Sequence, residues 1–128
     1  MPLTHILVVA DVRRSRPWYT DVLGAEMVRE YGGDSAVLRF AGAWLLLVTG
    51  GGPTPDKPNV TLAAPEDPDQ RDHLFTIRVQ DCVAAYELLT ERGASFLTAP
   101  LTTGQETRAF FRDPDGHLFE ISEYRAAT

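Results

Sequence analysis

The sequence is short of several residue types, and each shortage excludes a class of protein. Cys82 is the only cysteine, so no disulfide can form within the chain and nothing indicates an oxidising compartment. No apolar run approaches the ~18 residues of a membrane span. The segment LTHILVVA at residues 3–10 is short and has no basic segment before it, so we expect no signal peptide and a cytoplasmic protein.

Basic residues are also scarce. Lys and Arg number 12 against 18 Asp and Glu, the formal net charge is −6, and Lys57 is the only lysine. Nucleic acids and anionic membranes attract clustered cations, and the only local group here is Arg13, Arg14 and Arg16. We therefore expect neither a nucleic-acid nor a membrane partner.

The residues that are present are those of an ordinary globular protein. The chain has 128 residues, 44% apolar and 23% charged, enough for one domain with a sizeable core. Short apolar runs bounded by Gly, Pro and Asp predict strands at 4–10, 25–31, 36–40, 43–48, 73–79, 95–97, 107–112 and 118–124. One helix, capped by Asp11 or Ser15, is predicted to end at Gly24, and a second, capped by Asp81, covers 82–92.

Two further features of the sequence have two interpretations each. Residues 49–72 are rich in Gly, Pro and Asp and predict a long loop, which is either a lid over a pocket or a plain linker. Cys82 follows Asp81 at a helix start, where a thiol pKa can be lowered. The interpretation favoured for Cys82 is a small, half-buried filler.

The two halves of the sequence repeat each other. His5 and His73 each lead a strand that ends at an aspartate, a helix with Tyr and Leu follows, and each helix ends in Gly-Ala. This order predicts a βαβββ module used twice within one domain, residues 1–128, with module one at about 1–50, the loop at 49–72 and module two at about 73–124. The predicted fold class is α+β, with the paired modules forming a curved mixed sheet around a cavity.

The repeat brings a carboxylate and two imidazoles to matching positions. Glu120 lies four residues after Gly116, and the residue four after Gly42 is Leu46. If the strands curl around one axis, His5, His73, Glu120 and Leu46 converge inside the cavity. A buried carboxylate is costly unless it is paired or bound to a cation, and two His with one carboxylate form a known divalent-metal triad. The alternative is that a histidine donates a hydrogen bond to Glu120 and no metal is bound.

Three segments carry a resemblance to a known family. The stretches THILVVAD and WYTDVLGAE, HLFTIRVQD, and FFRDPDGHLFEISEY resemble the vicinal oxygen chelate superfamily over nearly the whole chain. That superfamily includes glyoxalase I, methylmalonyl-CoA epimerase, extradiol dioxygenases, fosfomycin-resistance thiol transferases and bleomycin-resistance proteins. The resemblance implies that His5, His73 and Glu120 hold a divalent ion (Fe, Mn, Zn or Ni).

Departures from the family pattern limit which reaction the resemblance implies. Leu46 stands where glyoxalase I has a second carboxylate ligand. Phe110 and Phe111 lie where a ring-cleaving dioxygenase needs polar groups for proton transfer. Fosfomycin enzymes need a cationic cluster, for which Arg108 and Arg112 are available without any nearby lysine. Bleomycin-resistance proteins keep the fold, lack the metal and bind a cationic drug in an acidic groove; a net charge of −6 suits this alternative, but the retained His5, His73 and Glu120 do not.

These observations support two hypotheses. The first is a metal-dependent lyase, isomerase, thiol transferase or dioxygenase that acts on a small oxygen-bearing substrate, with Glu120 as ligand and catalytic base. The second is a non-catalytic module that binds an antibiotic or planar metabolite, and a domain with a vestigial site is a third possibility. The resemblance also implies a homodimer. The predicted substrate pocket comprises Trp44, Leu46, Phe75, Arg108, Phe110 and Tyr124.

Overall fold

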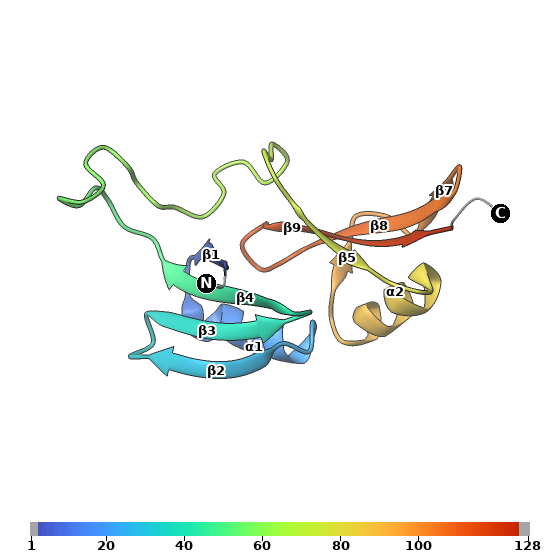
Figure 1. Cartoon of the computed structure of the whole chain (residues 1–128), viewed down its shortest axis with the longest axis horizontal. Helices are drawn as coiled ribbons and strands as arrows, with labels where there is room; N and C mark the ends of the chain where they lie inside the picture. The colour runs from blue at the N-terminus through green and yellow to red at the C-terminus, as the bar shows by residue number, and fades with distance from the viewer. Residues whose placement is uncertain (1–2, 126–128) are drawn as a thin grey trace. The chain divides into compact units, whose positions relative to one another are not determined.

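The computed structural model of the chain describes residues 3–125 (Figure 1). The chain divides into two compact units, Met1–Glu66 and Asp67–Thr128. Each unit contains one helix and one mixed sheet, so the predicted α+β class is confirmed. Between residues 3 and 125, no helix has the length and apolar character needed to span a membrane.

The first unit has the expected βαβββ order. Its elements are β1 (Thr4–Val9), α1 (Val12–Asp21), β2 (Glu26–Tyr31), β3 (Ser35–Phe40) and β4 (Ala43–Thr49). The sheet order is β1-β4-β3-β2, with β1 parallel to β4 and the other pairs antiparallel. Of the two predicted caps, Asp11 is the one that acts, since its side chain accepts a 2.9 Å hydrogen bond from the Arg13 N–H, whereas Ser15 is buried in the helix.

Helix α1 covers one face of the first sheet and packs on β3 and β4. Alternation along the strands places Leu7, Leu38, Leu45 and Leu47 on that face, and all are buried. The side chains of Val12 and Tyr19 close this core from the helix. The opposite face of the sheet has no helix of this unit on it.

The second unit repeats this order, except that two short strands stand where the first unit has the single strand β2. Its elements are β5 (Phe75–Arg78), α2 (Cys82–Glu91), β6 (Ser95–Phe96), β7 (Leu101–Thr103), β8 (Glu106–Arg112) and β9 (Leu118–Tyr124). The sheet order is β5-β9-β8-β6, β7 pairs with β8, and β5 runs parallel to β9. Asp81 caps α2 as predicted, accepting a 3.0 Å bond from the Ala84 N–H.

A run of aromatic rings forms much of the second core. Phe75 stacks on Phe119 at 5.0 Å, Phe119 on Phe111 at 5.4 Å, and Phe111 contacts Phe96 at 5.0 Å. Phe96 meets Tyr86 of α2 at 4.7 Å. The rings therefore connect β5, the first strand of this unit, to its helix through the helix-facing side of the sheet.

Two sequence expectations need correction. The strand predicted at 73–79 is shorter, since β5 starts at Phe75 and His73 lies before it. Strand β7 was not expected, because its three residues are all exposed and carry no apolar alternation.

The predicted long loop is present, and its ends are fastened. Between β4 and β5 the chain forms only isolated bridges, such as Gly51 with Leu62. In the second unit, Arg112 donates to the Pro68 carbonyl and, at 2.8 Å, to the Asp69 carboxylate. Gly116, in the hairpin turn at residues 113–117 that joins β8 to β9, has φ +93°. A Cβ there would lie 2.8 Å from the Pro68 Cβ, so the loop passes directly over this turn.

Candidate functional site

Glu120 lies in the middle of β9, with a strand on each side. Its register partners are Thr76 on β5 and Phe110 on β8, so the three side chains share the sheet face that carries no helix of this unit. The Thr76 hydroxyl donates a 2.7 Å hydrogen bond to Glu120 Oε1. Glu120 is half-buried, and between residues 3 and 125 no cationic side chain pairs with it.

The other carboxylate on this face is neutralised. Glu106 Oε2 accepts from the Ser122 hydroxyl at 2.9 Å and lies 3.9 Å from Arg78 Nη1, while Glu106 Oε1 lies 3.4 Å from Arg108 Nη1. Arg78 also donates to Ser122 at 3.0 Å. The contrast singles out Glu120 as the acceptor on this face that has capacity left for a ligand.

His73 makes its contacts elsewhere in the second unit. Its Nδ1 lies 2.9 Å from Asp72 Oδ1, and this hydrogen bond lowers the pKa of the Asp72 carboxyl. The imidazole meets the Phe75 ring edge-on at 5.8 Å, and Phe75 stacks on Phe119. Phe119 precedes Glu120 and points to the opposite face, so these contacts place His73 with the helix-facing side of the sheet.

His5 also follows the helix-facing register, in the first unit. It pairs with Leu45, whose side chain is buried against α1, but at the start of β1 the imidazole itself is exposed. Together with Leu3, Gly42, Ala43 and Trp44 it lines a hollow of about 380 Å³ at the end of the sheet.

The strand registers correct the expected equivalence of the two histidines. Ile6 pairs with Leu46 in the first unit, and Thr76 pairs with Glu120 in the second. The helix caps Asp11 and Asp81 give the same alignment, because Ile6 and Thr76 both lie five residues before their cap. His5 therefore corresponds to Phe75, and His73 corresponds to Leu3.

These registers bear on the predicted metal triad. No group of three or more His, Cys, Asp or Glu side chains that could hold a metal ion is present in the described part of the chain. Within the second unit, the contacts of His73 and Glu120 lie on opposite faces of the sheet, so this pair does not fit one shared ion. The triad of His5, His73 and Glu120 therefore stays a prediction, and the positions of His73 and Glu120 do not support it.

The predicted pocket residues divide between faces. Arg108, Phe110 and Tyr124 share the face of Glu120, and the Arg108 guanidinium lies 5.3 Å from the Phe110 ring centroid. Phe75 was expected in the pocket but belongs to the aromatic core on the other face. In the first unit, the helix-free face carries Trp44 and Leu46.

Sequence reasoning did not identify several residues on these faces. Thr76 holds the carboxylate of Glu120, and Glu106 organises the neighbouring arginines. In the first unit, Ile6 and Val37 flank Leu46, and the Arg39 guanidinium lies 4.5 Å from the Trp44 ring centroid. Aligning the halves on the capping aspartates, rather than on the histidines, would have identified Thr76 and Ile6.

Solved structures share the fold at low identity. A glyoxalase/bleomycin resistance protein/dioxygenase from Nocardioides has a TM-score of 0.78 and 22% identity, covering 100% of this chain and 85% of that one. TnmS3, an antibiotic binding protein from Streptomyces sp. CB03234, has a TM-score of 0.68, 21% identity and coverage of 98% and 96%. The fosfomycin resistance protein FosX from Listeria monocytogenes has a TM-score of 0.69, 17% identity and coverage of 98% and 94%.

A search of curated proteins found no match. The family model of the glyoxalase/bleomycin resistance protein/dioxygenase superfamily matches residues 3–121, which is most of the sequence. The two βαβββ units, the parallel pairing of first and last strands, and this match agree, and the chain belongs to that superfamily.

Proposed function

We propose that the chain binds a small organic molecule with a cationic or hydrogen-bond-donating group, and that Glu120 receives this group. The observation that carries the proposal is the state of the Glu120 carboxylate: half-buried in mid-sheet, hydrogen-bonded to Thr76 alone, and without a cation among residues 3–125. A partly desolvated carboxylate is costly without a partner, so a donor on the ligand gains a charge-assisted hydrogen bond.

The surroundings of Glu120 favour an aromatic body on that ligand. Phe110 lies beside it in register and Tyr124 shares the face, while Arg78 and Arg108 are engaged by Glu106. A planar ring can stack on Phe110 while its polar group reaches Glu120. The net charge of −6 attracts cations in general and agrees with this polarity. The antibiotic binding described for TnmS3 is a precedent on the same fold.

Two aromatic probes of opposite charge test the proposal. Ethidium, a planar aromatic cation, and anilinonaphthalene sulfonate, an aromatic anion, are titrated into the protein by isothermal calorimetry. We expect the cation to bind and Glu120→Gln to weaken it ~10- to 100-fold, because a hydrogen bond to a charged group contributes roughly 1.5–3 kcal/mol. Glu87→Gln, an exposed site on α2, makes the same charge change and is the matched control.

Two results would contradict the proposal. Equal loss of affinity in the Glu120→Gln and Glu87→Gln variants would mean that only net charge matters. Preference for the anionic probe would mean that the arginines, not Glu120, receive the ligand.

The metal-dependent enzyme expected from the sequence is the second candidate. The observation in its favour is the same free acceptor capacity of Glu120, which suits a metal ion as well as an organic cation. Metal content is measured after mild purification of the wild type and of His73→Ala. Stoichiometric metal that His73→Ala loses would favour the enzyme, and metal-free protein that binds ethidium would favour the binding module.

A further inference from the structure

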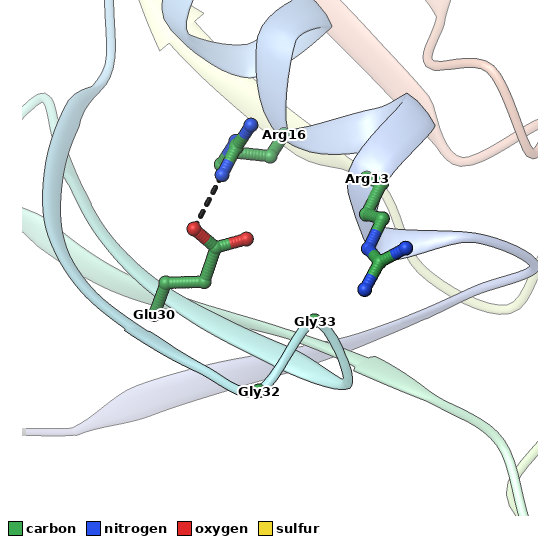
Figure 2. A pocket seen from close by; sticks show the side chains of 5 residues that line it. All are labelled: Arg13, Arg16, Glu30, Gly32 and Gly33. Atoms are coloured by element: carbon green, nitrogen blue, oxygen red, sulfur yellow. Dashed lines mark hydrogen bonds and ion pairs between the residues drawn. The ribbon is translucent and has the colours of Figure 1, made fainter.

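A hollow of about 470 Å³ lies in the first unit, between α1 and the turn that joins β2 to β3. It is lined by Arg13, Arg16, Glu30, Gly32 and Gly33, and Figure 2 shows Arg13 reaching from the helix toward Gly33 and Arg16 reaching toward Glu30. Arg13 and Arg16 are three residues apart, so they lie on the same side of α1. These residues belong to no part of the site described above.

The turn is built to bring its backbone close to Arg13. Gly32 and Gly33 have φ of +57° and +83°, and the Asp34 N–H donates to the Tyr31 carbonyl at 3.0 Å, as in a type I′ turn. A Cβ on Gly33 would lie 2.9 Å from Arg13 Nε, so the guanidinium lies directly against the backbone of the turn. The N–H groups of Gly32 and Gly33 donate to no backbone carbonyl in the described part of the chain.

The two arginines differ in their charge partners. Arg16 forms an ion pair with Glu30, and both side chains are about one-third exposed, at 33% and 32%. The guanidinium of Arg13 pairs with no carboxylate among residues 3–125. With two arginines and one glutamate, the lining carries one uncompensated positive charge in a chain of net charge −6.

We propose that this hollow is an oxyanion site that binds a phosphate or carboxylate group. The Arg13 guanidinium supplies two parallel N–H donors of the kind that bind such groups bidentately. The free N–H groups of the glycine turn add neutral donors beside it, and Arg16 provides a second positive charge that Glu30 partly offsets.

The test is a ¹H–¹⁵N NMR titration of the full chain with sodium phosphate at low ionic strength. Sodium chloride at matched ionic strength is the reference, because screening alone shifts surface resonances. We expect the Gly32 and Gly33 amide signals to move saturably with phosphate and not with chloride. Arg13→Gln, at an exposed position, should weaken phosphate binding at least about tenfold, as expected for a lost charged hydrogen-bond donor.

Two further variants keep the result interpretable. Arg92→Gln removes an exposed arginine of the second unit and should leave phosphate binding unchanged. Glu30→Gln removes the opposing carboxylate and should tighten binding about two- to fivefold. The proposal is overturned if phosphate and chloride shift the glycine signals alike, or if Arg13→Gln and Arg92→Gln weaken phosphate equally.

Discussion

Replacement of Phe119 by alanine tests the aromatic core of the second unit. Phe119 is 1% exposed on β9 and its ring lies between two others, 5.0 Å from Phe75 and 5.4 Å from Phe111. Because β9 lies between β5 and β8, removing this ring opens a cavity beside the central pairing of the sheet.

The expected loss follows from the two stacked neighbours. Burial of a phenylalanine plus the cavity left by its removal corresponds to roughly 3–5 kcal/mol in the free energy of unfolding. Each ring pair contributes about 0.5–1.5 kcal/mol of this. Phe119→Leu fills most of the cavity but loses both ring pairs, so we expect a smaller loss of about 1–3 kcal/mol.

Urea denaturation followed by circular dichroism measures both losses. Trp18 and Trp44 both belong to the first unit, so tryptophan fluorescence recorded in parallel follows the surroundings of side chains in that unit. Tyr124→Ala on the same strand, at a side chain 62% exposed, is the control and should stay within about 0.5 kcal/mol of the wild type. A loss below about 1 kcal/mol for Phe119→Ala would refute the ring-stack account of this core.

Two further predictions concern the contact between α2 and β9. Burial, followed by the nearby carboxylates of Glu123 and Asp81, raises the pKa of the Cys82 thiol. The native protein should therefore react with Ellman's reagent no faster than it unfolds. Rapid stoichiometric labelling would instead support a reactive Cys82. The pKa of Glu123 is lowered below its ordinary 4.5, first by the Cys82 N–H, which donates to Glu123 Oε1 at 2.9 Å, and then by the hydrogen bond with Arg125. The charged form is therefore favoured in the folded state, and its contribution is present above pH 4.5 and is lost as pH falls through the lowered pKa. Urea denaturation should show Glu123→Gln to be less stable than the wild type at pH 7 and equal to it in strong acid; a difference that persists in acid would contradict this.

Much of the fold could be predicted because local signals agree with the tertiary structure. Asp11 and Asp81 are good helix caps, and each precedes a helix that begins at the next residue. The Asp113 side chain accepts from the N–H groups of Asp115 and His117, which explains why the hairpin turn was identifiable from its residue types.

The candidate site was harder to predict because it depends on strand register. A single-residue change in register moves a side chain to the other face, and no local residue reveals where a strand first pairs. The match of His5 with His73 rested on their identical residue type. The pairing of β1 with β4 and of β5 with β9 instead makes Ile6 equivalent to Thr76. Of the three predicted metal ligands, only Glu120 lies in mid-strand on the helix-free face, because its distance from the turn between β8 and β9 is set by the sequence.

The central place of β9 has a consequence for synthesis on the ribosome. Strand β9 follows every other strand of its sheet in the sequence, yet it separates β5 from β8. Until residues 118–124 emerge from the exit tunnel, the edges of β5 and β8 that pair with β9 are free to bind wrong partners. The sheet of the first unit can form once Thr49 has emerged. A premature stop codon just before Leu118 therefore removes a central strand of the second sheet and not an edge strand.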